Sequence, residues 1–223
     1  MRVNKYKIKT FIQARMSSGR LKGKVLKKIY GNTILEHVYS SAEQVFKKKD
    51  IIILTSTEKS DDKINQFCIN KNINVFRGDL QNVATRYYNA LQNFNCDYFF
   101  RVSADSPLID SKLFKLFINN LKKNTNLDLV SNVVKRTFPK GQSLELINSQ
   151  TFKKNINKFK AYDENFTIPF YKSTKFRIKS IENKKDLSGR NLCVDNFRDL
   201  ERIRYIFNKY KNIKSFNFNL HFK

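Results

Sequence analysis

Apolar positions along the chain recur with two periods, one typical of buried strands and one typical of amphipathic helices. Residues 51–55 form a continuous, largely β-branched apolar run, the pattern of a strand that is buried on both faces. Thr33 stands three residues before Glu36 in the spacing of a capping box, and apolar residues follow at helical intervals. Further strands are predicted at residues 7–12, 73–76, 97–102 and 127–131, and further helices at 82–94 and after Asp61, Asp62 and Asp110.

The order of these elements predicts a parallel sheet. Strands and helices alternate from residue 7 to residue 131, as in an α/β fold with a doubly wound, mostly parallel sheet covered on both faces. Beyond residue 133 we expect strands at 143–147, 176–181 and 191–194, and helices at 149–159, 163–172 and 197–210. No repeat or low-complexity linker divides the chain, so residues 1–223 are interpreted as one domain with a small lid-like insertion at roughly 135–185.

The net charge of the chain is unusual. Its 223 residues include 44 Lys and Arg against 19 Asp and Glu, a balance of +25 that is typical of proteins binding nucleic acid or anionic membranes. The excess consists of 32 Lys against 12 Arg and accompanies 26 Asn and 20 Ile, the skew that an AT-rich coding sequence imposes on any protein. Because the lysines are spread over the whole chain, we interpret the charge as a composition bias and expect no nucleic-acid partner.

Several classes of protein are excluded by what the sequence lacks. No segment approaches the ~18 consecutive apolar residues of a membrane span, and residues 1–10 lack the apolar core of a secretory signal, so no membrane association is expected. The three cysteines have no metal-type spacing and indicate reduced thiols in a cytoplasmic protein. With only His37 and His221 available, a bound metal would be held by carboxylates, which favours Mg²⁺.

A basic loop follows the first predicted strand. Arg15, Arg20 and Lys24 stand there among the small residues Ser17, Ser18, Gly19 and Gly23. Small residues let backbone amides approach a phosphate, and the cations neutralise its charge. The structural alternative is a solvated basic loop without a ligand.

Two acidic residues follow predicted strands elsewhere in the chain. Asp105 comes after the strand at 97–102, and Asp195 comes after the strand at 191–194. Ligands of parallel sheets bind beyond the carboxyl ends of the strands, where these acids could hold Mg²⁺ against phosphate oxygens. Asp105 alone could instead be a helix N-cap or a turn former. Together with the basic loop they indicate a site for a nucleotide and Mg²⁺.

Residues 11–26, which read Phe-Ile-Gln-Ala-Arg-Met-Ser-Ser-Gly-Arg-Leu-Lys-Gly-Lys-Val-Leu, resemble the opening of cytidylyltransferases of the spore-coat-polysaccharide and acylneuraminate type. The resemblance continues in the same order through motifs at 35–38, 55–57, 75–79, 86–87, 101–110, 136–141 and 194–200. It implies a Rossmann-like nucleotide-diphospho-sugar transferase fold and the transfer of CMP from CTP to a sugar or sugar acid, with release of pyrophosphate, for a surface polysaccharide or glycan. It also suggests a homodimer.

The same resemblance implies roles for individual residues. Arg15, Lys24 and Asp105 are expected to be catalytic, Asp105 and Asp195 to hold Mg²⁺, and Glu145 to contact the acceptor. The residues expected to bind the nucleotide are Ala14, Arg15, Ser18, Arg20, Lys24, Arg77, Arg86 and Arg101.

The chain also departs from the pattern of that family. Ser17 and Ala104 stand where glycines are usual, and Ser143 stands where an aspartate is usual. Further departures are Gly19, Lys22, Asn165 and Asn191. These departures leave open the alternative that the chain is a family member that binds a nucleotide without turning it over. The remaining alternative is a basic protein that binds nucleic acid.

Overall fold

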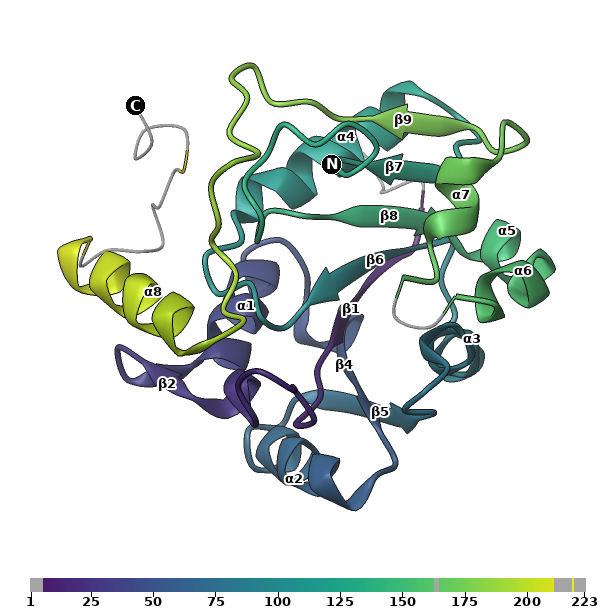
Figure 1. Ribbon diagram of the computed structural model, residues 1–223. Helices are drawn as coiled ribbons and strands as arrows, with labels where there is room; N and C mark the ends of the chain where they lie inside the picture. Colours follow the sequence, from purple (N-terminus) through teal and green to yellow (C-terminus); the bar gives the residue numbers. More distant parts are fainter. Residues whose placement is uncertain (1–5, 163–164, 211–217, 219–223) are drawn as a thin grey trace.

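A seven-stranded sheet forms the centre of the part of the chain that the structure describes (Figure 1). The structure is a computed structural model, and the described residues are 6–162, 165–210 and 218. The strand order is β5-β4-β1-β6-β8-β7-β9, and β8 is the one described strand of this sheet that runs antiparallel to its neighbours. The strands are β1 (Ile8–Gln13), β4 (Ile51–Ser56), β5 (Asn74–Gly78), β6 (Tyr98–Ser103), β7 (Leu129–Ser131), β8 (Glu145–Asn148) and β9 (Ile178–Ser180).

The strand order confirms the predicted doubly wound fold. The chain starts at β1, moves outward through β4 to the edge strand β5, and returns to the other side of β1 with β6. A topological switch of this kind opens a crevice at the carboxyl ends of β1 and β6, where ligands of such folds bind. The smaller described elements are β2 (Lys28–Ile29), β3 (Asn32–Thr33), η1 (Lys24–Leu26), η2 (Lys48–Asp50) and η3 (Lys59–Asp61).

Helices cover both faces of the sheet because the central strands are apolar on both sides. Ile12 and Ile53 pack into one core cluster with α1, α2, α4 and α8, whereas Phe11 and Leu54 pack into a second cluster with α3, α5, α6 and α7. Figure 1 shows α3, α5 and α6 grouped on one side of the strands. The helices are α1 (Ile34–Glu43), α2 (Asp62–Asn70), α3 (Val83–Asn93), α4 (Ser111–Lys123), α5 (Ser149–Lys154), α6 (Ile156–Lys160), α7 (Ile168–Lys172) and α8 (Phe197–Lys209).

Residues 191–194, predicted as a strand, are not one. Asn191 makes a single isolated bridge with Lys140. The Asn191 side-chain oxygen accepts a hydrogen bond from the Cys193 amide at 2.9 Å, a local turn that competes with strand pairing. Asp195 therefore follows an irregular segment. The sequence indicated that it lies at the end of a strand, and that prediction is wrong.

Two predicted helices are also shorter than expected. The helix predicted at 149–159 is interrupted at Asn155 and forms α5 and α6. The helix predicted at 163–172 is reduced to α7, and Pro169 in its first turn suits this start because proline has no N–H to donate to an earlier turn. Residues 163 and 164 lie outside the described part of the chain.

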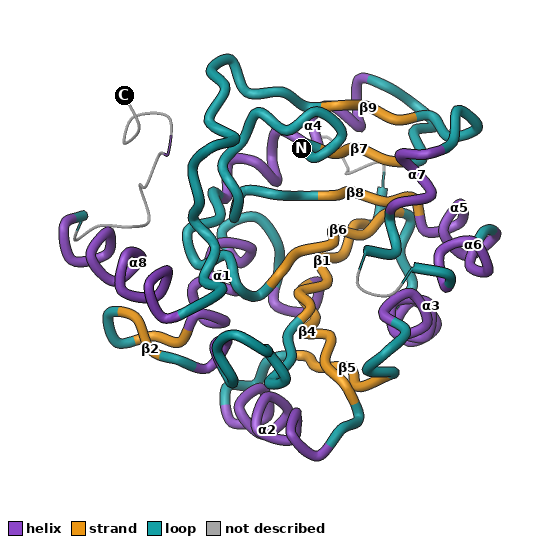
Figure 2. The backbone as a smooth tube through the Cα atoms, viewed as in Figure 1, coloured by secondary structure: helices purple, strands orange, loops and turns teal. Residues whose placement is uncertain are grey.

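The stretch predicted as a lid-like insertion, roughly 135–185, contains β8 and β9 as well as the short helices α5, α6 and α7. Two strands of the central sheet thus come from this stretch, and its movement as a lid stays a prediction. The connection from β9 to α8 runs as a loop along its described length (Figure 2). Among the described residues, no helix has the length and apolar character needed to cross a membrane.

Candidate active site

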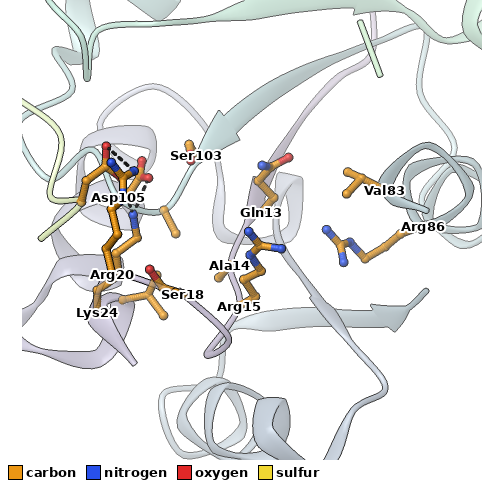
Figure 3. A pocket seen from close by; sticks show the side chains of 14 residues that line it. Gln13, Ala14, Arg15, Ser18, Arg20, Lys24, Val83, Arg86, Ser103 and Asp105 are labelled. Carbon is orange, nitrogen blue, oxygen red and sulfur yellow. Dashed lines mark hydrogen bonds and ion pairs between the residues drawn. The ribbon is translucent and has the colours of Figure 1, made fainter. Parts of the chain in front are cut away.

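A cavity of about 290 Å³ opens beyond the carboxyl ends of β1 and β6 (Figure 3). Most of the residues predicted to bind nucleotide or metal line it, and they come from the loop after β1, from α3, from the loop after β6 and from the segment before α8. Those lining residues are Ala14, Arg15, Ser18, Arg20, Lys24, Arg86, Asp105 and Asp195. Arg77, Arg101 and Glu145 are not among the residues that line it.

The loop after β1 is held in a fixed shape by backbone bonds and one buried acid. Gly23 has φ +66°, a left-handed conformation that favours glycine, and its amide bonds the Met16 carbonyl at 2.9 Å. The Met16 amide in turn donates to Asp61 Oδ1 at 2.7 Å. Asp61 is fully buried and also accepts bonds from the amide and hydroxyl of Ser56. It was predicted only to open a helix, yet it ties the loop after β1 to the end of β4.

Lys24, Asp105 and Asp195, which we call the carboxylate cluster, meet at one end of the cavity. Lys24 Nζ lies 2.9 Å from Asp105 Oδ2 and 2.9 Å from Asp195 Oδ1. Arg20 Nη2 lies 3.1 Å from the other oxygen of Asp195, and Figure 3 shows Arg20 and Lys24 beside Asp105. The fold brings these groups together from the basic loop after β1, the loop after β6 and the segment before α8.

The charges of the carboxylate cluster stabilise one another. Burial alone lowers the pKa of the Lys24 ammonium, but the charges and hydrogen bonds of Asp105 and Asp195 outweigh this and hold that pKa above its ordinary value. Burial raises the pKa of the Asp195 carboxyl, and Lys24 and Arg20 outweigh this and hold it below its ordinary value. At neutral pH the Asp195 carboxylate is consequently ionised at the edge of the cavity.

The donor set of the carboxylate cluster fits Mg²⁺. Two carboxylate oxygens converge on one point, since each lies 2.9 Å from the same Lys24 nitrogen. Mg²⁺ is commonly held by one or two carboxylates, and water and substrate phosphates complete its shell. The described residues contain no group of three or more His, Cys, Asp or Glu side chains placed to hold a metal. Asp105 and Asp195 are the two carboxylates that line this cavity.

The opposite end of the cavity carries two guanidinium groups. Figure 3 shows the Arg15 and Arg86 side chains pointing toward one another. Arg86 is 3 % exposed, and its Nη1 donates to the Asp79 carbonyl at 2.9 Å. Burial lowers the pKa of Arg86, and the like charge of Arg15 lowers it further against the attraction of nearby acids. This end of the cavity suits an anion, because an anion would offset the repulsion between the two cations.

Arg101, Glu145 and Tyr171 form a separate group, which we call the inner cluster. Arg101 Nη1 lies 2.6 Å from Glu145 Oε2, and the two residues face each other across the β6–β8 pair. Tyr171 donates its hydroxyl to the other oxygen of Glu145, and the Arg101 guanidinium lies 5.1 Å from the centre of the Phe166 ring. Burial and the Glu145 charge raise the pKa of Tyr171. The roles predicted for Arg101 and Glu145 stay predictions.

Arg77 is also placed away from the cavity lining. Its side chain donates to the carbonyls of Ser56 and Glu58 and pairs with Asp62 at 2.7 Å. It joins the end of β4 to the start of α2, so its predicted nucleotide contact stays a prediction.

Six of the lining residues were not among the predicted site residues: Gln13, Gly19, Val25, Val83, Ser103 and Ala104. Gln13 and Ser103 are the last residues of β1 and β6 and are partners in the sheet register. Their position at strand ends is a signal that could have found them. Ala104, which stands in place of a glycine, is buried and has no positive φ, so its side chain causes no backbone strain.

Comparisons with known proteins identify the family of the chain. A family model described as Cytidylyltransferase matches residues 10–218. The spore coat polysaccharide biosynthesis protein SpsF of Bacillus subtilis is 26% identical over 210 residues, which cover 89% of this chain and 85% of that protein. A 3-deoxy-manno-octulosonate cytidylyltransferase of Elusimicrobium minutum is 30% identical over 122 residues, which cover 54% of this chain and 48% of that protein.

A solved structure shows the same fold over nearly the whole chain. The cytidylyltransferase from Leptospira borgpetersenii serovar Hardjo-bovis superposes with a TM-score of 0.86 at 26% identity, covering 93% of this chain and 89% of that one. The chain spans about half the length of two curated relatives that it matches, 51% and 48%. The family match covers most of the sequence and confirms the resemblance found in its motifs. This chain belongs to the cytidylyltransferase family.

Proposed function

We propose that this chain transfers CMP from CTP to a hydroxyl oxygen of a sugar or sugar acid and releases pyrophosphate. The observation that carries the proposal is the cavity, which has Asp105, Asp195 and Lys24 at one end and Arg15 and Arg86 at the other. Such an arrangement suits a triphosphate and its metal. The names of the relatives, which refer to a coat polysaccharide and to an octulosonate, favour a glycan precursor as the acceptor.

In the proposed reaction, the acceptor oxygen attacks the α-phosphorus of CTP in line with the leaving pyrophosphate. The new bond joins the acceptor oxygen to this phosphorus, and the bond to the α–β bridging oxygen breaks with its electron pair left on pyrophosphate. The hydroxyl proton passes to water. Arg15, Arg20 and Lys24 hold the phosphates, and their charges stabilise the departing pyrophosphate.

Asp105 and Asp195 would hold Mg²⁺ in this reaction. When bound, Mg²⁺ supplies positive charge that stabilises the phosphate oxygens during displacement at phosphorus. Lys24 pairs with both acids at 2.9 Å, and its flexible stem also allows the ammonium to turn toward a phosphate. Arg86 would bind an anionic group of the nucleotide from the opposite wall of the cavity.

The replacement Asp105→Asn tests the proposal. Removing one preorganised electrostatic element typically lowers the rate by about 10²–10³-fold, and we expect a loss of that size in pyrophosphate release with CTP and candidate sugar acids. Asp110→Asn is the matched control, because Asp110 lies in the same loop, caps α4 and does not line the cavity. Asn caps a helix as well as Asp, so this variant should keep the wild-type rate. Full activity of Asp105→Asn would refute the assignment.

A nucleotide-binding member without turnover is the second candidate, since Ser17 and Ser143 depart from the family pattern. Thermal unfolding with each of the four nucleoside triphosphates and Mg²⁺ separates binding from turnover, because a ligand at 100 times its Kd adds about 2.7 kcal/mol of stability. Stabilisation by CTP without pyrophosphate release would favour this candidate.

We also propose a cytoplasmic location, because the three cysteines are free thiols in the structure. A homodimer is expected from the resemblance, and sedimentation of the purified chain measures it. We expect no binding to nucleic acid. A titration with DNA at several salt concentrations tests this, because binding to the phosphate backbone weakens as salt rises.

A further inference from the structure

Asp195 lies on a segment that has little regular structure to hold it. The segment before α8 makes one isolated bridge, between Asn191 and Lys140. One further backbone bond joins the Val194 amide to the Asp105 carbonyl at 2.9 Å, which links the two acid-bearing segments. A carboxylate needs a fixed orientation to serve as a metal ligand. Lys24 and Arg20 contact the Asp195 carboxylate itself, and further contacts must fix the backbone that carries it.

The carboxylate of Asp199 binds the backbone around Asp195. Its Oδ2 accepts hydrogen bonds from the amides of Asp195 at 3.0 Å and Asn196 at 3.2 Å. The bond to Asn196 belongs to the capping box of α8, in which the Asn196 side chain accepts from the Asp199 amide. The bond to the Asp195 amide is additional to that box. It fixes the backbone of the residue that carries the metal-binding carboxylate.

Arg202 supports this arrangement from the next turn of α8. Its Nη1 lies 2.8 Å from Asp199 Oδ1, and its Nη2 donates to the Cys193 carbonyl at 3.3 Å. The Arg202 guanidinium therefore contacts the Cys193 carbonyl, which precedes Asp195, and also contacts Asp199. The Asp199 carboxylate in turn binds the amides of Asp195 and Asn196. Arginine suits such a bridge because its planar guanidinium holds several N–H donors in fixed directions. A lysine ammonium is a compact point charge and lacks this geometry.

A second ion pair on the same helix provides a contrast. Arg204 Nη1 lies 2.7 Å from Glu201 Oε1, with the same three-residue spacing. Both of these side chains are at least 40 % exposed, whereas the Asp199 side chain is 8 % exposed. The contacts of this second pair do not reach residues 193–196. Both ion pairs lie on α8, but the Asp199–Arg202 pair also contacts residues 193–196. A comparison of the two pairs therefore separates stabilisation of the helix from positioning of the Asp195 backbone.

We infer that Asp199 and Arg202 are positioning residues that orient Asp195 as a metal ligand. This inference rests on the proposed function, in which Asp105 and Asp195 hold the metal. Asp199 and Arg202 touch neither the cavity nor a reacting group, and they act through the backbone of residues 193–196.

The test measures metal binding directly, with Mn²⁺ alone as the probe and electron paramagnetic resonance of free Mn²⁺ as the readout. The full chain is compared with Asp199→Asn, Arg202→Gln, Asp195→Asn and the control Glu201→Gln. Loss of a group that orients a metal ligand typically weakens binding by about 10–100-fold, and we expect this for Asp199→Asn and Arg202→Gln. The Mg²⁺ concentration that gives half the maximal rate should rise by a similar factor, and Glu201→Gln should match the wild type.

Two results overturn the inference in distinguishable ways. If Asp195→Asn loses Mn²⁺ while Asp199→Asn and Arg202→Gln keep wild-type affinity, Asp195 is a ligand that needs no positioning by α8. If Asp195→Asn itself keeps wild-type affinity, the proposed metal site fails and the inference fails with it. Melting temperatures show which variants fold. Arg202→Gln leaves the Asn196 cap intact, so it keeps the comparison available if Asp199→Asn does not fold.

Discussion

The carboxylate cluster and the inner cluster both pair a cation with a carboxylate but differ in position. In the carboxylate cluster, two acids share Lys24 in the connections beyond the carboxyl edge of the sheet, and Asp195 is 32 % exposed. In the inner cluster, Glu145 is 4 % exposed and pairs with Arg101 within the β6–β8 pair. Charges beyond strand ends remain open to exchange partners with a ligand, whereas charges inside the sheet are committed to one another. The two clusters therefore differ in position, since the carboxylate cluster lines the cavity and Arg101 and Glu145 do not.

The largest effect that distinguishes the two clusters is expected from Glu145→Gln. This change leaves the Arg101 guanidinium buried without its counter-charge, and breaking a buried pair from one side costs about 3–5 kcal/mol. Urea unfolding should show this loss in the free energy of unfolding. Glu201→Gln on α8 is the control, since an exposed pair contributes about 1 kcal/mol or less. A loss for Glu145→Gln as small as that of the control would contradict the contrast between the clusters.

Lys24→Met should have the opposite profile, with a large effect on catalysis and a small effect on stability. We expect pyrophosphate release to fall by about 10²–10³-fold, because the phosphates lose a preorganised cation. Water reaches Asp105 and Asp195 at the cavity, so the repulsion between them is screened and the free energy of unfolding should change by about 1 kcal/mol. A loss of stability as large as that of Glu145→Gln, with the rate retained, would show that Lys24 has a structural role.

The smallest effect is expected in the acid range and concerns Asp195. Its folded-state pKa is held below the ordinary value of 3.8, so its stabilising contribution is complete above that pH. As the pH falls below 3.8, the unfolded chain takes up the proton first, and the contribution is lost as the pH passes through the lowered folded pKa. Urea unfolding of the wild type and of Asp195→Asn should therefore converge at low pH. A difference that stays constant with pH would exclude this carboxylate as the source.

The parallel half of the fold and most of the cavity could be predicted from the sequence because both follow local rules. Buried runs such as 51–55 and the Thr33 capping box mark their elements without help from distant residues. Arg15 and Asp105 could be assigned because each stands just past such a strand.

The remaining features depend on contacts between distant segments. Glu145 faces Arg101 because β8 runs antiparallel to β6, and no short turn between them sets this register. Asp61 binds Met16 only because the loops after β1 and β4 meet in the folded chain. The Asn191 turn replaces a predicted strand where Lys140 offers a single bridge. The hydrophobic periodicity of the sequence does not show which distant segments meet in the folded chain.

The hydrogen bond from the Val194 amide to the Asp105 carbonyl has a consequence for the order of events during synthesis. A ribosome that has released β1, β4, β5 and β6 has delivered the basic loop and Asp105, and domains tend to fold as their parts emerge. Asp195 emerges much later, after β9, and joins across a long loop, a closure that slows folding. A nascent chain would thus present Lys24 and Asp105 of the carboxylate cluster well before Asp195 arrives.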